Sequence, residues 1–296
     1  MSSNEIYDSW RVSGANNRWV YYMLDAGCRL VSRRTSHRVA DSIMEWYSGR
    51  DPGLPAVVAG NLRKAFPALP PHQIEWLAMS TLRSYARGVA DYLRARRDPP
   101  LMLPPGDGNH EALADPGGKV ILCAHMGNWE LGGVVLGKRI GPHWVLAFPE
   151  RDEGLDRFRR RRRDRAGLVT VHPGEGLDTI LHLRRLLEQG RSLIVLVDRE
   201  VGRDRIEVTF RNRSTYFLKS PALLAEMADV PVIPVAVMAE GRGSYRPVVG
   251  RPCRLRGLGS QHPGETMQRA ADFFSGILER YPDQWYNFFP FWGEDS

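Results

Sequence analysis

Apolar side chains recur at helical spacing in the first third of the chain. Residues 16–95 therefore predict a helical region, of which 71–93 is the clearest helix. The apolar stripe of that helix consists of Ile74, Leu77, Ala78, Leu82, Tyr85, Val89 and Tyr92. Such a stripe is typical of a helix that packs against a core. Residues 98–108, rich in proline and glycine, predict a loop after this region.

Short apolar runs alternate with amphipathic segments in the rest of the chain. The runs predict strands at 119–124, 144–148, 168–172, 193–198, 206–210, 231–238 and 246–251. The segments between them predict helices at 129–139, 153–165, 175–189, 221–229 and 262–280. This alternation indicates an α/β fold with a central, mostly parallel sheet flanked by helices. We expect one domain over 1–296, with a helical N-terminal part at 1–100 and an α/β core at 116–292.

The predicted strand at 119–124 leads into a turn with polar side chains. His125 should lie at the carboxyl end of the strand, Gly127 breaks the strand, and Asn128 is a good helix N-cap, which places Glu130 in the first helical turn. Ligand sites of open α/β sheets lie at this end of the strands. A neutral histidine oriented by a carboxylate can take a proton from an alcohol. A histidine in a turn is also commonly just a hydrogen-bonded loop residue.

A second acidic segment follows a predicted central strand. It reads Asp198-Arg199-Glu200 and should lie on the same edge of the sheet as His125. A carboxylate here could bind the far nitrogen of the imidazole and stabilise the imidazolium that forms during proton transfer. The sequence does not decide between Glu130 and Glu200 for this contact. Asp198 could instead cap the following turn or pair with Arg205.

Positive charge is concentrated in one segment. The formal net charge is +7, and the nine residues from Arg157 to Arg165 contain seven arginines and one aspartate. Three interpretations fit: a solvated helix face, a nucleic-acid contact, or an anionic partner such as lipid phosphates or an acidic carrier protein. No recognisable nucleic-acid motif accompanies the run, so no nucleic acid is expected. With an anionic partner, Arg163 is the arginine expected to point into the site.

Cysteine content and hydropathy limit the class of protein. Cys28, Cys123 and Cys253 are widely spaced and form no C-x-x-C, so neither a disulfide framework nor a zinc site is predicted and a reduced environment is expected. No apolar run reaches the length needed to span a bilayer. No signal peptide is evident in the polar first fifteen residues. Residues 19–31 fit an interfacial helix or an amphipathic core helix equally well.

The turn after the first core strand resembles a known catalytic element. It reads His125-Met126-Gly127-Asn128-Trp129-Glu130 and is similar to the H-x-x-N-W-[DE] element of bacterial lipid A biosynthesis (lauroyl or myristoyl) acyltransferases and of the related phosphatidylinositol mannoside acyltransferases. This element is a version of the H-x4-[DE] motif of glycerolipid acyltransferases. Further segments follow in the family's order over about 15–292: Arg163-Asp164-Arg165-Ala166-Gly167, Asp198-Arg199-Glu200, Ser220-Pro221-Ala222-Leu223-Leu224 and Tyr281-Pro282-Asp283-Gln284-Trp285.

The resemblance implies an O-acyltransferase with a glycerolipid acyltransferase-like fold. Such an enzyme moves a long-chain acyl group from an acyl-CoA or acyl-carrier-protein thioester to a hydroxyl of a membrane lipid, either a glycolipid or a lysophospholipid. It needs no metal or cofactor, and we expect a monomer attached peripherally to the cytoplasmic side of the inner membrane. The implied catalytic residues are His125 as general base, Glu130, Arg163, Asp198 and Glu200. The implied substrate-binding residues are Asn128, Trp129, Arg160 and Ser220, although Ser220 better fits a helix N-cap.

Two other classes of protein remain. A thiol enzyme could use Cys123 with His125, but Cys123 lies inside an apolar run, where cysteine usually behaves as a buried hydrophobe. A non-enzymatic membrane-surface or nucleic-acid binding protein could act through Arg157–Arg165. The sequence contains no G-x-S-x-G, H-E-x-x-H, Walker A or G-x-G-x-x-G motif, so the chemistries of those motifs have no support.

Overall fold

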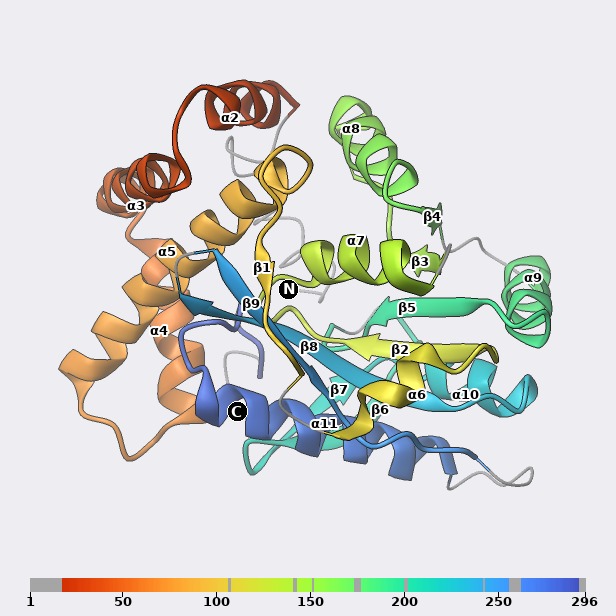
Figure 1. Cartoon of the computed structure of the whole chain (residues 1–296). Coiled ribbons are helices and arrows are strands. Elements are labelled where there is room, and N and C mark those ends of the chain that lie inside the picture. Colours follow the sequence, from red (N-terminus) through yellow and green to blue (C-terminus); the bar gives the residue numbers. More distant parts are fainter. Residues whose placement is uncertain are drawn as a thin grey trace.

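The computed structural model describes residues 18–105, 108–140, 143–150, 152–172, 177–199, 202–241, 243–255 and 262–292 (Figure 1). At its centre is a seven-stranded sheet in the order β1-β9-β8-β2-β5-β3-β4. The strands are β1 (Leu101–Met102), β2 (Lys119–Cys123), β3 (His143–Leu146), β4 (Leu168–Val171), β5 (Ser192–Leu196), β8 (Val232–Gly241) and β9 (Ser244–Val249). All neighbours pair in parallel except β8 with β9. The predicted α/β fold with a mostly parallel sheet is confirmed.

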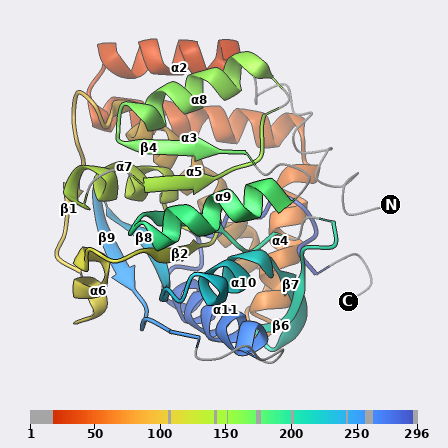
Figure 2. The same cartoon turned by 90° about the vertical axis from the view of Figure 1, so that its right-hand side faces the viewer.

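Strand β2 is buried on both faces, which explains its unbroken apolar run. Val120 and Leu122 pack on one face, in the same core cluster as residues of α9 (Leu177–Glu188), α10 (Ser220–Met227) and α11 (His262–Arg280). Figure 2 shows these three helices side by side. Ile121 and Cys123 face the opposite side, where α6 (Glu111–Ala114) and α7 (Trp129–Ile140) cover them. The sheet therefore lies between two layers of helices.

The N-terminal helices lie beyond the carboxyl ends of β2 and β5 (Figure 1). They are α2 (Arg18–Leu30), α3 (Arg33–Arg50), α4 (Gly53–Ala65) and α5 (Pro71–Arg94). The first three all pack against α5. The apolar stripe predicted for α5 contributes to a core shared with α4 and with Tyr286 and Phe288, which follow α11. Helix α8 (Glu153–Asp164) contacts both α2 and β4. The helical N-terminal part is thus joined to the sheet at the edge where the predicted site lies.

Two strands were not predicted from the sequence. β1 lies inside the predicted loop at 98–108 and pairs with only Ser244 and Tyr245 of β9, so it is too short to show periodicity. β7 (Arg213–Phe217) forms an antiparallel hairpin with β6 (Ile206–Phe210). Its turn has positive φ at Arg211 (52°) and Asn212 (60°), as a two-residue type I′ turn requires. Arg-Asn is a weaker signal for such a turn than Asn-Gly.

Helix α6 was not predicted from the sequence either, and the remaining differences are small shifts at element ends. The predicted helix at 175–189 is described from Leu177 onward, because 173–176 lie outside the described residues. A 3₁₀ turn, η1 (Gly108–His110), precedes α6. Among the helices of the described part of the chain, none is both long enough and apolar enough to cross a bilayer.

Candidate active site

The turn between β2 and α7 is held by backbone contacts. Gly127 has φ of +57°, and a Cβ atom there would lie 2.2 Å from the carbonyl oxygen of Val237. The N–H of Gly127 donates to the carbonyl of Gln284 at 2.8 Å, and that of Asn128 donates to the carbonyl of Val237 at 2.8 Å. The Asn128 Oδ1 accepts from the N–H of Leu131 at 3.2 Å, which makes Asn128 the expected N-cap of α7. Only glycine fits position 127 without strain.

Asp198 is the carboxylate that binds His125. The Nδ1 atom of His125 lies 2.7 Å from Oδ1 of Asp198. The backbone N–H of His125 also donates to both carboxylate oxygens, at 3.0 Å each. The expectation that Glu130 or Glu200 orients the His125 ring is therefore wrong, because Asp198 makes this contact. Glu200 itself lies outside the described residues.

A segment after α11 supports this pair. The Nδ2 atom of Asn287 donates to Oδ2 of Asp198 at 3.2 Å. The N–H of Tyr286 donates to the carbonyl of His125 at 2.7 Å. Arg199 donates from Nη2 to the carbonyl of Tyr286 at 3.1 Å and from Nε to Oδ1 of Asn287 at 3.4 Å. The carboxylate of Asp198, a residue that is 2 % exposed, is thus fixed by the His125 backbone and the Asn287 amide as well as by the ring.

Burial and a nearby charge keep the imidazole neutral. Burial, followed by the positive charge of Arg199, lowers the pKa of His125 and outweighs the opposite effect of Asp198. Burial of Asp198 opposes its ionisation, but His125 and Arg199 together hold the pKa of this carboxyl below its ordinary value. An ionised Asp198 accepts a hydrogen bond from Nδ1–H, which assigns the tautomer with Nε2 unprotonated. Among the described residues, Nε2 forms no hydrogen bond, so it is the atom that can accept a proton.

Glu130 pairs with Arg163 instead of with the imidazole. The guanidinium binds the carboxylate with two parallel hydrogen bonds, of which the one from Nε measures 3.1 Å. Burial favours the neutral acid, but the charge of Arg163 and of the neighbouring arginines outweighs it and keeps the pKa of Glu130 below its ordinary value. As expected, Arg163 points inward. Its fork is occupied by Glu130, so the two act as one fixed unit.

His125 and the Glu130–Arg163 pair line the same cavity, whose volume is about 220 Å³. Most of its wall is aromatic or aliphatic, with side chains from α5 on one side and from the ends of β3 and β5 on the other. Trp129 contributes its indole, which meets the His125 ring edge-on at a centroid distance of 5.2 Å. Asn128 borders the cavity, but its amide nitrogen donates to the carbonyl of Gly88 at 2.9 Å. Asn128 therefore ties the turn to α5.

Two expected substrate-binding residues lie elsewhere. Arg160 is exposed and does not border the cavity, whereas Arg159 does. The physical reason is helical spacing, because Leu155, Arg159 and Arg163 of α8 share one face at intervals of four residues. Ser220 is the first residue of α10, and Lys219 is the N-cap of this helix. The backbone N–H of Ser220 donates to Oδ1 of Asp204 at 2.8 Å. Neither Arg160 nor Ser220 lines this cavity.

The thiol alternative finds no support in the geometry. Cys123 points into the core between the sheet and α7. Burial, with a smaller effect of Asp198, raises the pKa of the Cys123 thiol to about 12. The nucleophilic form of cysteine is the thiolate, so this side chain would be inert at neutral pH.

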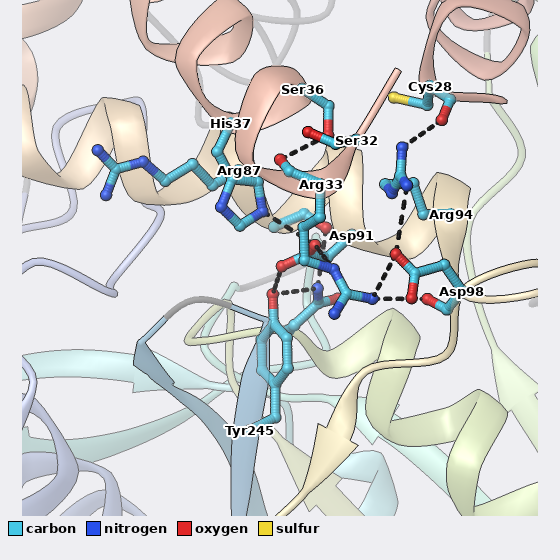
Figure 3. A network of polar contacts seen from close by, with 12 residues as sticks. Cys28, Ser32, Arg33, Ser36, His37, Arg87, Asp91, Arg94, Asp98 and Tyr245 are labelled. Atoms are coloured by element: carbon cyan, nitrogen blue, oxygen red, sulfur yellow. Dashed lines mark hydrogen bonds and ion pairs between the residues drawn. The ribbon is translucent and has the colours of Figure 1, made fainter. Parts of the chain in front are cut away.

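A buried polar network anchors the turn from behind (Figure 3). Asp91 of α5 is 1 % exposed and accepts from the hydroxyl of Tyr245 at 2.7 Å. It also contacts Nε2 of His37 at 2.9 Å and Nε of Arg33 at 3.2 Å, both on α3. The Tyr245 hydroxyl lies 3.4 Å from the amide nitrogen of Asn128. The N-cap of α7 is thereby linked through one buried carboxylate to the N-terminal helices.

Three residues of the site were not identified from the sequence: Arg159, Arg199 and Asn287. Helical spacing along α8 would have selected Arg159, and Arg199 stood inside a segment already singled out. Asn287 gave no local signal, because its partner Asp198 is 89 positions away. A contact of that kind follows from the tertiary fold alone.

The chain is similar to known acyltransferases over most of its length. A family described as bacterial lipid A biosynthesis acyltransferase matches residues 9–293. The chain is similar to the phosphatidylinositol mannoside acyltransferase of Mycolicibacterium smegmatis, at 26% identity over 280 residues, covering 91% of this chain and 90% of that protein. It is also similar to the phosphatidylinositol mannoside acyltransferase of Mycobacterium tuberculosis, at 27% identity over 186 residues, covering 62% of this chain and 57% of that protein.

Proposed function

This chain belongs to the bacterial lipid A biosynthesis acyltransferases, and from that membership we propose that it transfers a long-chain fatty acyl group from a thioester to a hydroxyl of a membrane glycolipid. The donor would be acyl-CoA or an acyl-carrier protein. The relatives named above are phosphatidylinositol mannoside acyltransferases, and we propose an acceptor of that general class, a lipid whose head group carries sugar hydroxyls. The observation that carries this proposal is the His125–Asp198 pair in the wall of a mostly apolar cavity.

The chemistry begins with the unprotonated Nε2 of His125. It takes the proton of the acceptor hydroxyl as the oxygen attacks the thioester carbonyl, and a C–O bond forms. Asp198 stabilises the resulting imidazolium through Nδ1. The tetrahedral intermediate carries a negative oxygen, for which we propose backbone N–H groups in the first turn of α7 as donors. Collapse breaks the C–S bond, and the imidazolium returns its proton to the departing thiolate.

Each remaining feature of the site has a part in this scheme. The thioester arrives activated, so the transfer requires no ATP, metal or covalent enzyme intermediate. The aromatic wall excludes water, which would otherwise hydrolyse the thioester. Glu130 and Arg163 fix α8 against α7 and form part of the cavity wall. We assign them to positioning and keep the proton transfer for His125.

We further propose that α2 and α3 attach the protein to the membrane. Helix α2 buries Tyr21 and Cys28 against α5 and α8, yet it leaves Trp19, Met23 and Leu30 exposed. Helix α3 exposes Val39, Ile43 and Trp46 at intervals of four and three residues, which places them on one face. Exposed aromatic and aliphatic residues next to arginines are the composition of an interfacial helix. Because acyl thioester donors are cytosolic, this surface would face the cytoplasmic side of the inner membrane. We propose that the protein acts there as a monomer.

The arginine run supports an enzyme better than a non-enzymatic binding protein. Arg159, Arg162 and Arg163 turn inward and pair with Glu150, Asp25 and Glu130 respectively. The run therefore does not form one continuous basic surface for a nucleic acid. These buried ion pairs fix α8 against the rest of the fold, as expected for the wall of an enzyme site.

Purified protein assayed with palmitoyl-CoA and a membrane lipid extract tests the proposal. We expect acylated lipid with the wild type, none with His125→Ala, and full activity with Cys123→Ser. Mass spectrometry of lipids from cells with and without the gene then identifies the acceptor. Unchanged turnover in His125→Ala, with the same fold by circular dichroism, would contradict the assignment.

A further inference from the structure

A second, larger cavity lies beside the His125 pocket, and several charged residues are among those that line it. Its volume is about 640 Å³, and Tyr92 belongs to the walls of both cavities. It forms where the carboxyl ends of α2, α5 and α8 come together. Its charged lining consists of Arg29, Arg94, Arg96, Arg97, Arg162, Arg165, Asp25 and Asp98. With six arginines against two aspartates, the wall carries a formal charge of four positive. We call this space the arginine cavity.

Part of this charge serves the fold. Arg94 donates to the carbonyl of Cys28 near the end of α2 (Figure 3). It also donates to the carbonyl of Val31, just after α2, at 2.6 Å. Arg162 donates to the carbonyls of Tyr92 and Leu93 near the end of α5, at 3.0 and 2.7 Å. Arg97 likewise donates to the carbonyl of Arg29 in the last turn of α2. Guanidinium groups thus bind carbonyls at the ends of both helices, where the helix leaves acceptors available. Three of the six arginines are therefore explained by the packing of the helix ends.

The capping contacts do not cancel the charge of the wall. Asp25 pairs with Arg29 and Arg162, and each helix end adds roughly half a negative charge. Three such ends still leave roughly two to three positive charges. Arg96 and Arg165 are exposed and line the cavity, and neither side chain has a hydrogen bond or ion pair among the described residues. The cavity thus keeps two guanidinium groups that no contact within the described part of the protein uses.

The surroundings of the cavity indicate the kind of anion. Leu30 is 85 % exposed and Val31 is also exposed, and both follow Arg29 directly at the edge of the cavity. The exposed apolar side of α2 continues from there to Met23. Guanidinium groups match the oxygens of a phosphate with paired hydrogen bonds. An apolar rim next to a cationic hollow fits a molecule that joins a phosphate to acyl chains.

We infer that the arginine cavity binds the phosphate of an anionic phospholipid, with Arg96 and Arg165 as its contacts. The acyl chains of that lipid would lie over Leu30 and Val31 in the membrane surface. Tyr92, which belongs to the walls of both cavities, is the residue that this site shares with the His125 pocket. The inference rests on the proposed attachment of α2 to the membrane and does not depend on the proposed chemistry at His125.

Dihexanoyl phosphatidylglycerol below its micelle concentration is a suitable probe, because it presents one phosphate without a membrane surface. We expect titration calorimetry to show binding to the full-length protein. A double variant with Arg96→Gln and Arg165→Gln should bind at least about tenfold more weakly, as the loss of charge-assisted hydrogen bonds predicts. The matched control has Arg161→Gln and Arg185→Gln, which removes the same charge from exposed positions outside the cavity. It should bind the lipid like the wild type.

Three results would overturn the inference. An equal loss in both double variants would mean that diffuse charge attracts the lipid, and no loss in either would mean that the cavity does not bind it. The third result concerns coenzyme A. If the Arg96/Arg165 double variant bound coenzyme A tenfold more weakly but still bound the lipid normally, the cavity would belong to the acyl-CoA donor. His125→Ala should bind the lipid normally while it loses transfer, so failure of the proposed reaction and failure of this site give different results. Thermal melting curves of each variant, compared with that of the wild type, check that the variants are folded.

Discussion

Asp198 binds His125 through two different groups, the ring Nδ1 at 2.7 Å and the backbone N–H at 3.0 Å. The carboxylate therefore sets the position of the main chain as well as the tautomer of the ring. Because Asn287 and the segment around Tyr286 hold this pair from the other side, the imidazole has little freedom to turn. The geometry of this site and of the surfaces around it leads to five predictions.

Asp198→Asn should keep the fold and lose most of the activity. The amide can still bind the backbone of His125, but it cannot stabilise an imidazolium by charge. We expect kcat to fall by about 10³- to 10⁴-fold, as for other histidine–carboxylate pairs. Asn287→Ala removes only one neutral contact to the carboxylate and should cost far less. Steady-state kinetics of both variants compare them, and equal effects would contradict a role for the charge.

Arg199 should set the acid limb of the pH profile. Its charge lowers the pKa of His125, so the imidazole stays neutral at pH values where an ordinary histidine is already partly protonated. In Arg199→Met the pKa of His125 rises, and the acid limb of kcat/KM should move to higher pH. Arg199→Lys keeps the charge, and its limb should stay near that of the wild type. A limb that moves equally in both variants would point to lost geometry instead of lost charge.

Glu130→Gln should be strongly destabilising. The change leaves the buried Arg163 charge without its carboxylate, which costs about 3–5 kcal/mol of unfolding free energy. The exposed pair between Arg184 and Glu188 provides the control, and Glu188→Gln should cost less than about 1 kcal/mol. Urea denaturation measures both changes. Similar losses in the two variants would show that the Glu130–Arg163 pair is no more important than a surface pair.

Gly127→Ala should disrupt the site. The added Cβ would lie 2.2 Å from the backbone of Val237, at a φ that disfavours any side chain. We expect loss of activity and a lower melting temperature. Gly276 lies in α11, where an added Cβ would meet nothing within 4 Å, so Gly276→Ala should leave activity unchanged and stabilise the protein by about 0.4–1 kcal/mol. An active, stable Gly127→Ala variant would show that the turn can relax.

Trp19→Ser combined with Met23→Ser should weaken attachment to vesicles. Both side chains are exposed, at 65 % and 67 %, so the substitutions should not alter the melting temperature. Loss of their burial in the interface predicts at least about a tenfold drop in partitioning to phosphatidylglycerol vesicles. Leu181→Ser, at an exposed position on α9, is the control and should partition like the wild type. Sedimentation with vesicles distinguishes these outcomes.

The sequence predicted the local parts of the site well. The apolar run, the glycine and the N-cap all act within a few residues, so they located β2, the turn with His125 and the start of α7. The alternation of runs and amphipathic segments likewise predicted the parallel sheet, and with it the edge where His125 and the segment at 198–200 meet.

The register between β2 and β5 determines which carboxylate meets His125, a question that the sequence left open. Cys123 pairs with Leu196, and this alignment brings the backbone of His125 beside Asp198, two positions before Glu200 in the chain. A shift of two residues would have placed another carboxylate there, and no local pattern specifies the alignment of two buried parallel strands. The contacts of Asn287 and of the Asp91–Tyr245 network are similarly beyond local inference.

The support of Asp198 by Asn287 also has a consequence during biosynthesis. His125 and Asp198 leave the ribosome long before the segment after α11, which supplies Asn287 and the backbone contact of Tyr286. A nascent chain that has folded only its sheet thus holds an unsupported pair. We therefore expect the fully supported pair to assemble only after α11 and the segment behind it have been synthesised, which ties completion of the site to completion of the chain.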